Sequence, residues 1–210
     1  MATKTYGLTT ETRLKARLGI DSTDAARDAV FKSMVYAVTD FIENACGGRR
    51  FQRATYTNDK YDGNEIGDGT VLNWLTLKNG PVISVSSVQY ATGPVSNPTW
   101  VDFPADSYQV DLNLGQIYFS GGMPRGMQNI RVTYVAGYLI AFASEYDDTL
   151  HTLPFDINDL AERLATKVMK RRESEGKSQE SFNNSGITWG DFLETHDREI
   201  LANYRRVFAV

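Results

Sequence analysis

The sequence predicts an α+β fold in which a frame of N-terminal and C-terminal helices carries an inserted antiparallel β domain. Apolar residues recur at helical spacing through residues 1–52, which are expected to form the N-terminal helices. Residues 53–140 are rich in β-branched residues and in turns of Gly, Asn and Asp, so they are expected to form the β domain. Helical spacing returns in residues 141–210, the expected C-terminal helices, which contain a polar loop at 173–186.

A short helix is expected first. The side chain of Thr9 or Thr10 can accept a hydrogen bond from a backbone N–H group of the first turn, which makes either residue a suitable N-cap. Leu14 and Leu18 lie on one side of this helix, and Gly19 follows at the position where a left-handed residue ends a helix.

A longer helix is expected to begin between Ser22 and Asp24 and to end at Gly47-Gly48. Its apolar residues form one continuous stripe at spacings of three and four: Val30, Phe31, Met34, Val35, Val38, Phe41, Ile42 and Ala45. Burial stabilises each large side chain by roughly 1.5–3 kcal/mol, so the helix needs a partner surface. That surface is either the core of the same domain, which we favour, or an oligomer interface.

The β domain is expected to contain about six short strands in a small antiparallel sheet or barrel. The candidate segments are Ala54–Thr57 with Lys60–Tyr61, Val71–Leu77, Val82–Tyr90, Tyr108–Val110, Gln116–Phe119 and Ile130–Val135. A turn is expected at Asn79-Gly80-Pro81. The glycine-rich segment Gly121–Gly126 lacks the Gly-Lys-Ser/Thr of a phosphate-binding loop, so we expect it to be a hairpin loop between the last two strands.

Pro154 and Asp156 are expected to open a third helix that runs to about Arg172. A short basic cluster lies in its last turns: Lys167, Lys170, Arg171 and Arg172. Cations at this position complement the helix dipole, which is the favoured interpretation over a contact with nucleic acid.

The chain then becomes almost wholly polar over Glu173–Gly186. Such a segment buries too little surface to order itself, so we expect it to be mobile in the free monomer and ordered on assembly. A last helix is expected from Asp191 or Thr195 to Val207, with Ile200, Leu201 and Tyr204 on its apolar side.

Composition limits the classes of function. The chain has 22 basic and 26 acidic residues and a net charge of −4, which argues against DNA binding driven by a concentrated basic surface. The single cysteine, Cys46, allows no intrachain disulfide, fits a reducing compartment, and is interpreted as a small buried residue near a helix end rather than a nucleophile. The sequence shows neither a signal peptide nor the roughly 18 apolar residues of a membrane span.

No catalytic, cofactor-binding or metal-binding residues are predicted. His151 and His196 stand in no paired-ligand spacing, so each is expected to be a surface or cap residue. The acidic turn from Asp59 to Glu65 does not match a calcium loop, because Tyr61 and Gly63 replace the required oxygen ligands. No nucleophile–base pair is present either, and the sequence therefore predicts a protein that is not an enzyme.

An alternative function rests on aromatic residues in and around the predicted strands. Tyr56, Tyr61, Trp74, Tyr90 and Trp100 could form a face on which sugar rings stack. Such residues more often fill cores and cross-strand pairs. A carbohydrate- or ligand-binding β module framed by helices is therefore the second hypothesis.

Several segments, in this order, resemble the head-to-tail connector (adaptor) proteins of long-tailed bacteriophages and gene-transfer particles. The resemblance spans nearly the whole chain and identifies it with the larger class that carries a developed β domain. The segments are Leu8-Thr-Thr, Leu18-Gly-Ile-Asp21, Phe41-Ile-Glu-Asn-Ala-Cys-Gly-Gly-Arg-Arg-Phe51, Tyr61-Asp-Gly, Leu75–Val88, Val132-Thr-Tyr-Val-Ala-Gly-Tyr138, Leu153-Pro154 and Ile200–Val207.

The resemblance implies a structural virion protein without catalytic or metal residues or cofactors. Members of this family form a ring, usually of twelve copies, that lies in the neck between the portal and the stopper or tail-completion protein. DNA passes through the ring without sequence-specific binding, and a slightly acidic chain suits such a channel. The protein would be made in the cytoplasm of the host bacterium.

The C-terminal segment is the candidate docking site for the portal. It comprises Tyr204, Arg205, Arg206, Val207 and Phe208, and Tyr and Arg are residue types that often anchor interfaces. The alternative is that Ile200, Leu201, Tyr204 and Phe208 simply pack on the third helix of the same subunit. Truncation separates the two hypotheses.

Overall fold

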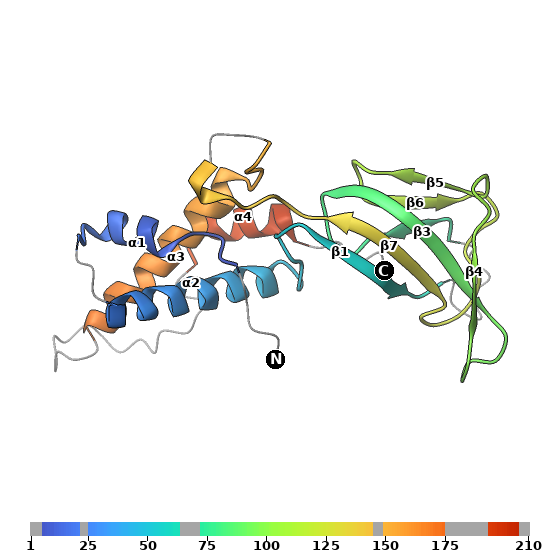
Figure 1. The fold of residues 1–210 in the computed structure, drawn as a ribbon, viewed down its shortest axis with the longest axis horizontal. Helices are drawn as coiled ribbons and strands as arrows, with labels where there is room; N and C mark the ends of the chain where they lie inside the picture. The colour runs from blue at the N-terminus through green and yellow to red at the C-terminus, as the bar shows by residue number, and fades with distance from the viewer. Residues whose placement is uncertain (1–5, 22–24, 64–71, 145–148, 175–192, 206–210) are drawn as a thin grey trace. The chain divides into compact units, whose positions relative to one another are not determined.

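The computed structural model describes residues 6–21, 25–63, 72–144, 149–174 and 193–205. These residues form two compact units. The helical unit comes from the chain before Arg50 and after Tyr138, and the β unit is formed by Arg50–Tyr138. Helices and antiparallel sheets are both present, so the predicted α+β fold is confirmed (Figure 1).

The first helix, α1 (Glu11–Leu18), has the predicted caps. The side-chain oxygen of Thr10 accepts a hydrogen bond from the backbone N–H of Arg13 at 3.2 Å. Gly19 ends the helix in the left-handed conformation with φ of 67°, which glycine adopts without a Cβ clash. Leu14 is fully buried and holds α1 in the helical unit.

The long helix α2 (Ala25–Ala45) buries its apolar stripe inside the helical unit. Phe31, Val38 and Ile42 are at most 2% exposed, and α2 packs against both α1 and α3. The stripe therefore belongs to the core of the unit, as favoured over an oligomer interface. Gly47 and Gly48, both with positive φ, end the helix where predicted.

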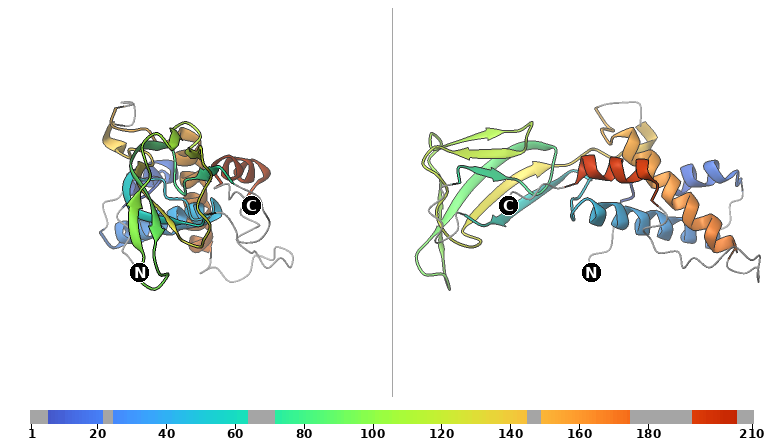
Figure 2. Two further views of the ribbon diagram at one scale, coloured as in Figure 1. Left: turned by 90° about the vertical axis from the view of Figure 1, so that its right-hand side faces the viewer. Right: turned by 180° about the vertical axis from the view of Figure 1, so that it is seen from behind.

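The C-terminal part of the helical unit contains α3 (Phe155–Ser174) and α4 (Thr195–Tyr204), preceded by a short 3₁₀ helix, η1 (Phe142–Ser144). Figure 2 shows α4 beside α3, and Ile200 and Leu201 on α4 are buried. The helix α4 ends at Tyr204, before the predicted Val207, which lies outside the described residues. The first two residues of the predicted polar loop at 173–186 belong to α3. The remainder of this loop, 175–186, lies outside the described residues.

The described residues of the β unit form seven strands in two antiparallel sheets (Figure 1). The four-stranded sheet has the order β1-β7-β3-β4, and the three-stranded sheet has the order β2-β6-β5. The strands are β1 (Ala54–Tyr61), β2 (Trp74–Thr76), β3 (Val82–Thr92), β4 (Thr99–Asp102), β5 (Tyr108–Asp111), β6 (Gln116–Phe119) and β7 (Ile130–Ala136).

Both sheets contribute to one hydrophobic core. Val88, Val132 and Tyr134 from the four-stranded sheet are buried in the same cluster as residues of the three-stranded sheet, namely Leu75, Ile117 and Phe119. Strand β7 lies at the centre of this arrangement, and its burial alternates residue by residue, as expected for a strand with one face on the core.

The structure corrects three strand predictions. β1 is one strand with a bulge between Tyr56 and Asp59, and Asn58 in that bulge has φ of 55°. Of the segment predicted from Val71 to Leu77, residues 72–77 are described and contain only the three-residue strand β2, and β4, which was not predicted, pairs with the end of β3.

The prediction of a hairpin at Gly121–Gly126 is wrong. Strand β6 pairs with β2 and β5, whereas β7 pairs with β1 and β3, so this segment connects the two sheets. One long-range and one local hydrogen bond hold the connection: the Gly63 N–H donates to the Gly126 carbonyl at 2.8 Å, and the Asn129 side chain donates to the Pro124 carbonyl at 3.0 Å. Glycine content alone does not specify which strands a loop joins.

Candidate functional site

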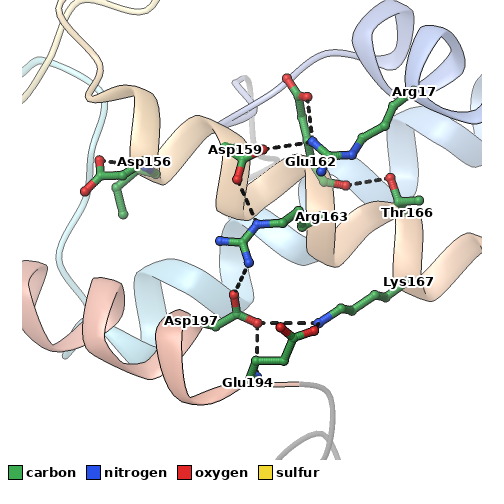
Figure 3. A network of polar contacts seen from close by, with 10 residues as sticks. Arg17, Asp156, Asp159, Glu162, Arg163, Thr166, Lys167, Glu194 and Asp197 are labelled. Carbon is green, nitrogen blue, oxygen red and sulfur yellow. Dashed lines mark hydrogen bonds and ion pairs between the residues drawn. The ribbon is translucent and has the colours of Figure 1, made fainter.

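The start of α4 is fixed by a reciprocal capping arrangement (Figure 3). The side chain of Glu194, the N-cap residue, accepts from the backbone of Asp197. The Asp197 carboxylate in turn accepts from the backbone N–H of Glu194 at 3.1 Å. Two N–H groups that the helix leaves unpaired are thereby satisfied, so α4 begins at a defined residue.

Asp197 also binds two cations of α3. Its carboxylate lies 2.5 Å from the Arg163 guanidinium and 3.5 Å from the Lys167 ammonium, and its side chain is fully buried. Lys167 makes a further contact with Glu194 at 2.7 Å. The carboxylate therefore joins α4 to α3 through charge-assisted hydrogen bonds in a solvent-excluded position.

The same face of α3 binds α1 (Figure 3). Arg17 of α1 contacts Asp159 at 2.9 Å and Glu162 at 3.3 Å, and Arg13 contacts Glu162 at 2.5 Å. Burial raises the pKa of the Asp159 carboxyl, but the hydrogen bond from Arg17 and the charges of Arg17 and Arg163 outweigh it, so its pKa is lowered overall. The Asp159 carboxyl thus stays ionised, and the two carboxylates of α3 join this helix to α1.

The end of α4 carries the first residues of the candidate docking site. The Tyr204 hydroxyl donates to the Asp156 carboxylate, with oxygen–oxygen distances of 2.9 and 3.1 Å. The Arg49 guanidinium donates to the Tyr204 carbonyl at 3.2 Å and lies 5.9 Å from the centre of its ring. Tyr204 is therefore fixed within the helical unit.

Arg205 follows with an exposed side chain and an extended backbone. Arg206, Val207 and Phe208 lie outside the described residues. The structure thus ends α4 at Tyr204 and describes only Tyr204 and Arg205 of the candidate docking segment.

Cys46 is fully buried near the end of α2, as predicted. Its Sγ atom lies 3.8 Å from the Leu201 carbonyl. Burial raises the pKa of the thiol to about 11, despite the opposing charge of Arg49. The thiol is protonated at neutral pH and buried, which are the properties of a structural cysteine.

The prediction that His151 is a surface or cap residue is wrong. Its side chain is 3% exposed and lies beside the Phe142 ring. The Nδ1 atom accepts the backbone N–H of Ala141 at 3.0 Å, and within the described chain no partner reaches the buried Nε2 atom. The second histidine, His196, has a side chain that is 70% exposed, as predicted for a surface residue.

Acidification is expected to destabilise the helical unit through His151. Burial, together with the charge of Arg13, lowers the pKa of this histidine in the folded protein. Below the unfolded value of about 6.5, the unfolded chain therefore binds a proton that the folded chain does not, and stability is lost.

Urea unfolding at pH 7.5 and 5.5 measures this effect. The variant His151→Asn keeps an acceptor for Ala141 but cannot titrate, so it should lose less stability over this interval than the wild type. His196→Asn, a change at an exposed site, should behave like the wild type. An equal loss in His151→Asn and the wild type would contradict the assignment.

The acidic turn of the β unit is used structurally. Asp59 accepts hydrogen bonds from the hydroxyls of Tyr61 at 2.9 Å and Tyr134 at 3.1 Å, and it contacts the Lys78 ammonium at 2.8 Å. Asn64 and Glu65 lie outside the described residues. Among the residues that are described, no group of three or more His, Cys, Asp or Glu is placed to hold a metal ion.

The five aromatic residues of the alternative function do not form one face. Tyr61 is buried, and the Tyr56 ring stacks on the Tyr134 ring with centroids 5.1 Å apart. Trp74 lies in the three-stranded sheet, whereas Trp100 lies in the four-stranded sheet beneath the Arg131 guanidinium. Tyr90 contacts Phe103. Most of these rings thus serve the core or cross-strand pairs.

The basic cluster of α3 is partly engaged in ion pairs. Lys167 pairs with Glu194 and Asp197, while Lys170 is exposed. The side chain of Arg172 lies outside the described residues. Within the described part of the chain, no helix is both long enough and apolar enough to cross a membrane.

Sequence reasoning missed the central residue of this site, Asp197. A signal was present, because Glu194 and Asp197 have the spacing of a capping box directly before the apolar residues of α4. The partners of Asp197 on α3 were not predictable from that spacing, since more than 30 residues separate Arg163 from Asp197 along the chain.

Comparisons with known proteins extend these findings. No protein-family model matches the chain, and no curated protein matches it. Among solved structures, the chain is similar to a chain described as "Neck of empty GTA particle computed with C6 symmetry". The two share 15% sequence identity with a TM-score of 0.51, over 95% of this chain and 90% of that chain. At this identity the likeness shows a common fold over nearly the full length of both chains.

Proposed function

We propose that this chain is a structural virion protein, a head-to-tail connector (adaptor) of a phage or gene-transfer particle. The observation that carries the proposal is the fold shared with the chain from a particle neck, which covers 95% of this chain. The sequence resemblance to connector proteins, which rests on separate motifs, supports the same function. Both the helical unit and the β unit fall within the matched length.

The chemistry of the described residues is consistent with a structural role. The buried carboxylate Asp197 is occupied by Arg163 and Lys167, and Asp59 is occupied by two tyrosine hydroxyls and Lys78. The buried thiol of Cys46 is protonated. These groups hold helices and strands together, as suits a structural protein.

In the particle, the chain forms a ring between the portal and the stopper or tail-completion protein, with the DNA channel through its centre. Twelve copies match the portal, and twelve is a multiple of the sixfold symmetry applied to the similar neck. The ring is closed by heterologous contacts between identical neighbours. The protein is made in the host cytoplasm and resides in the neck.

The portal contact is made by the C-terminal segment Tyr204, Arg205, Arg206, Val207 and Phe208. Tyr204 anchors this segment to the helical unit through Asp156 and Arg49. Arg205 is exposed at the point where the chain leaves α4 in an extended conformation. An anchored start followed by cationic and apolar residues suits an interface, since Arg and aromatic residues supply forked hydrogen bonds and large contact areas.

Imaging of particles that carry a tagged copy of this protein tests the proposal. A closed ring at the neck is expected, with the tag repeated at every subunit. A single copy per particle, a twofold dimer or absence from the neck would overturn it. Light scattering of the free protein measures its oligomeric state in the absence of the portal. A monomer in this experiment is compatible with the proposal, because assembly can require the portal as a template.

Nucleic-acid binding by the free protein is expected to be weak and without sequence preference. The net charge is −4, and Lys167 of the basic cluster is already paired with carboxylates. A fluorescence titration with duplex DNA at physiological salt should give a dissociation constant of about 10⁻⁴–10⁻⁶ M at best. Nanomolar binding to one sequence and not to a scrambled control would contradict the prediction.

A further inference from the structure

The four-stranded sheet of the β unit has two open edges. Its order is β1-β7-β3-β4, and in the described part of the chain no strand pairs with the outer side of β1 or β4. The backbone N–H and C=O groups along such an edge can accept another strand. The two edges are therefore candidate sites for pairing with another chain.

The strands at these edges are unusually exposed. In β1, Ala54 and Thr55 are exposed although they are adjacent in sequence, so both faces of this strand are accessible. In β4, Thr99, Val101 and Asp102 are exposed, with Val101 at 38%. A bulge interrupts β1 after Tyr56, which leaves a short regular stretch at its start, comparable in length to β4.

The directions of the two edges favour a head-to-tail arrangement. Each neighbouring pair in the sheet is antiparallel, and three such pairs separate β1 from β4, so these two strands run in opposite directions. When β4 of one copy lies beside β1 of the next, the new pair is again antiparallel. Such a contact uses different surfaces on the two copies and can continue around a ring.

The pairing register follows from the faces of the sheet. Tyr56 packs on the hydrophobic core, and Val101 lies opposite Tyr90, which lies opposite the buried Ile130. If the two sheets join into one continuous sheet, a core-side residue of β1 must lie opposite a core-side residue of β4. One register that satisfies this condition places Ala54 opposite Val101 and Arg53 opposite Asp102.

This register also pairs complementary charges. In the described chain, the Nε atom of Arg53 is buried without a hydrogen-bond partner. Asp102 is exposed at the end of β4, where one carboxylate oxygen accepts from the Gln89 side chain at 2.7 Å. Arg53 as a whole is only half-buried, and Asp102 is exposed, so this register sets a basic side chain of one copy opposite an acidic side chain of the next.

We propose that neighbouring copies join by antiparallel pairing of β4 in one copy with β1 in the next, with Arg53 opposite Asp102. This proposal rests on the ring proposed above and identifies the contact that closes it. A pairing of β1 with β1 or β4 with β4 would instead be twofold and would stop at a dimer.

Charge exchange tests the contact in assembled particles. Arg53→Glu and Asp102→Arg should each reduce incorporation of the protein into necks at least tenfold, because like charges then face each other. The double variant Arg53→Glu/Asp102→Arg should restore incorporation to within about twofold, since each interface regains one charge of each sign. Thermal unfolding of the free variants reports whether each chain folds. Folded single variants that incorporate normally, or a folded double variant that is not rescued, would overturn the pairing.

A disulfide provides a second readout that does not depend on folding energetics. The variant Ala54→Cys/Val101→Cys should give a ladder of crosslinked multimers on oxidation of the particles, because opposed residues in an antiparallel pair have the right spacing. Each single variant is the matched control and should give no ladder. A neck ring without the ladder would overturn this pairing and leave the proposed function standing, whereas absence of the protein from necks would overturn both.

Discussion

Replacing Asp197 by alanine is expected to lower the free energy of unfolding of the helical unit by about 3 kcal/mol. The Asp197 side chain is fully buried and receives Arg163 at 2.5 Å and Lys167 at 3.5 Å. Its removal leaves two cations without their shared anion. It also removes the acceptor of the Glu194 N–H group at the start of α4. The estimate is at the low end for a broken buried pair, because both cations retain some contact with solvent.

Urea unfolding monitored by circular dichroism measures the loss. Glu199→Ala is the matched control, because it removes the same charge from the same helix at a side chain that is 69% exposed. This control should change stability by no more than about 0.5 kcal/mol. Equal effects of the two substitutions would show that Asp197 does not join α4 to α3 as the structure indicates.

Removal of residues 205–210 is expected to abolish joining to portal-bearing heads while the helical unit stays folded. Tyr204 remains in this variant, so its hydroxyl still bonds Asp156 and its carbonyl still accepts from Arg49. Ile200 and Leu201 remain buried on α4. The truncation therefore removes four of the five proposed docking residues, all but Tyr204, and leaves the described contacts of the helix in place.

Binding of the truncated chain to purified heads is measured by co-sedimentation, beside the full chain. A companion variant, Tyr204→Phe, loses only the hydroxyl contacts to Asp156 and should cost about 1 kcal/mol in stability. A truncated chain that joins heads normally shows that the segment is dispensable. A truncated chain that unfolds shows that the segment belongs to the core, as the alternative hypothesis holds.

Local patterns were sufficient to predict the helices of this protein. The caps Thr10 and Gly19 delimit α1, and the apolar spacing in α2 identifies the face that is buried. These predictions succeeded because capping and periodic burial depend on residues within a few positions of each other. The strands β3, β6 and β7 were predicted for a similar reason, since β-branched or aromatic content is a local property.

Only the tertiary structure decided which distant residues meet. The chain from Gly121 to Gly126 connects two sheets instead of forming a hairpin, because β6 and β7 pair with different strands. His151 is buried, and Asp197 finds Arg163 on another helix. The sequence alone determined the α+β class, the helices and most of the strands. Packing decided which strands pair, which distant charges form ion pairs, which isolated polar residues are buried, and which strands lie at the sheet edges. The physical reason is that these contacts join residues far apart in the chain, and their free energy depends on neighbours that no local pattern specifies.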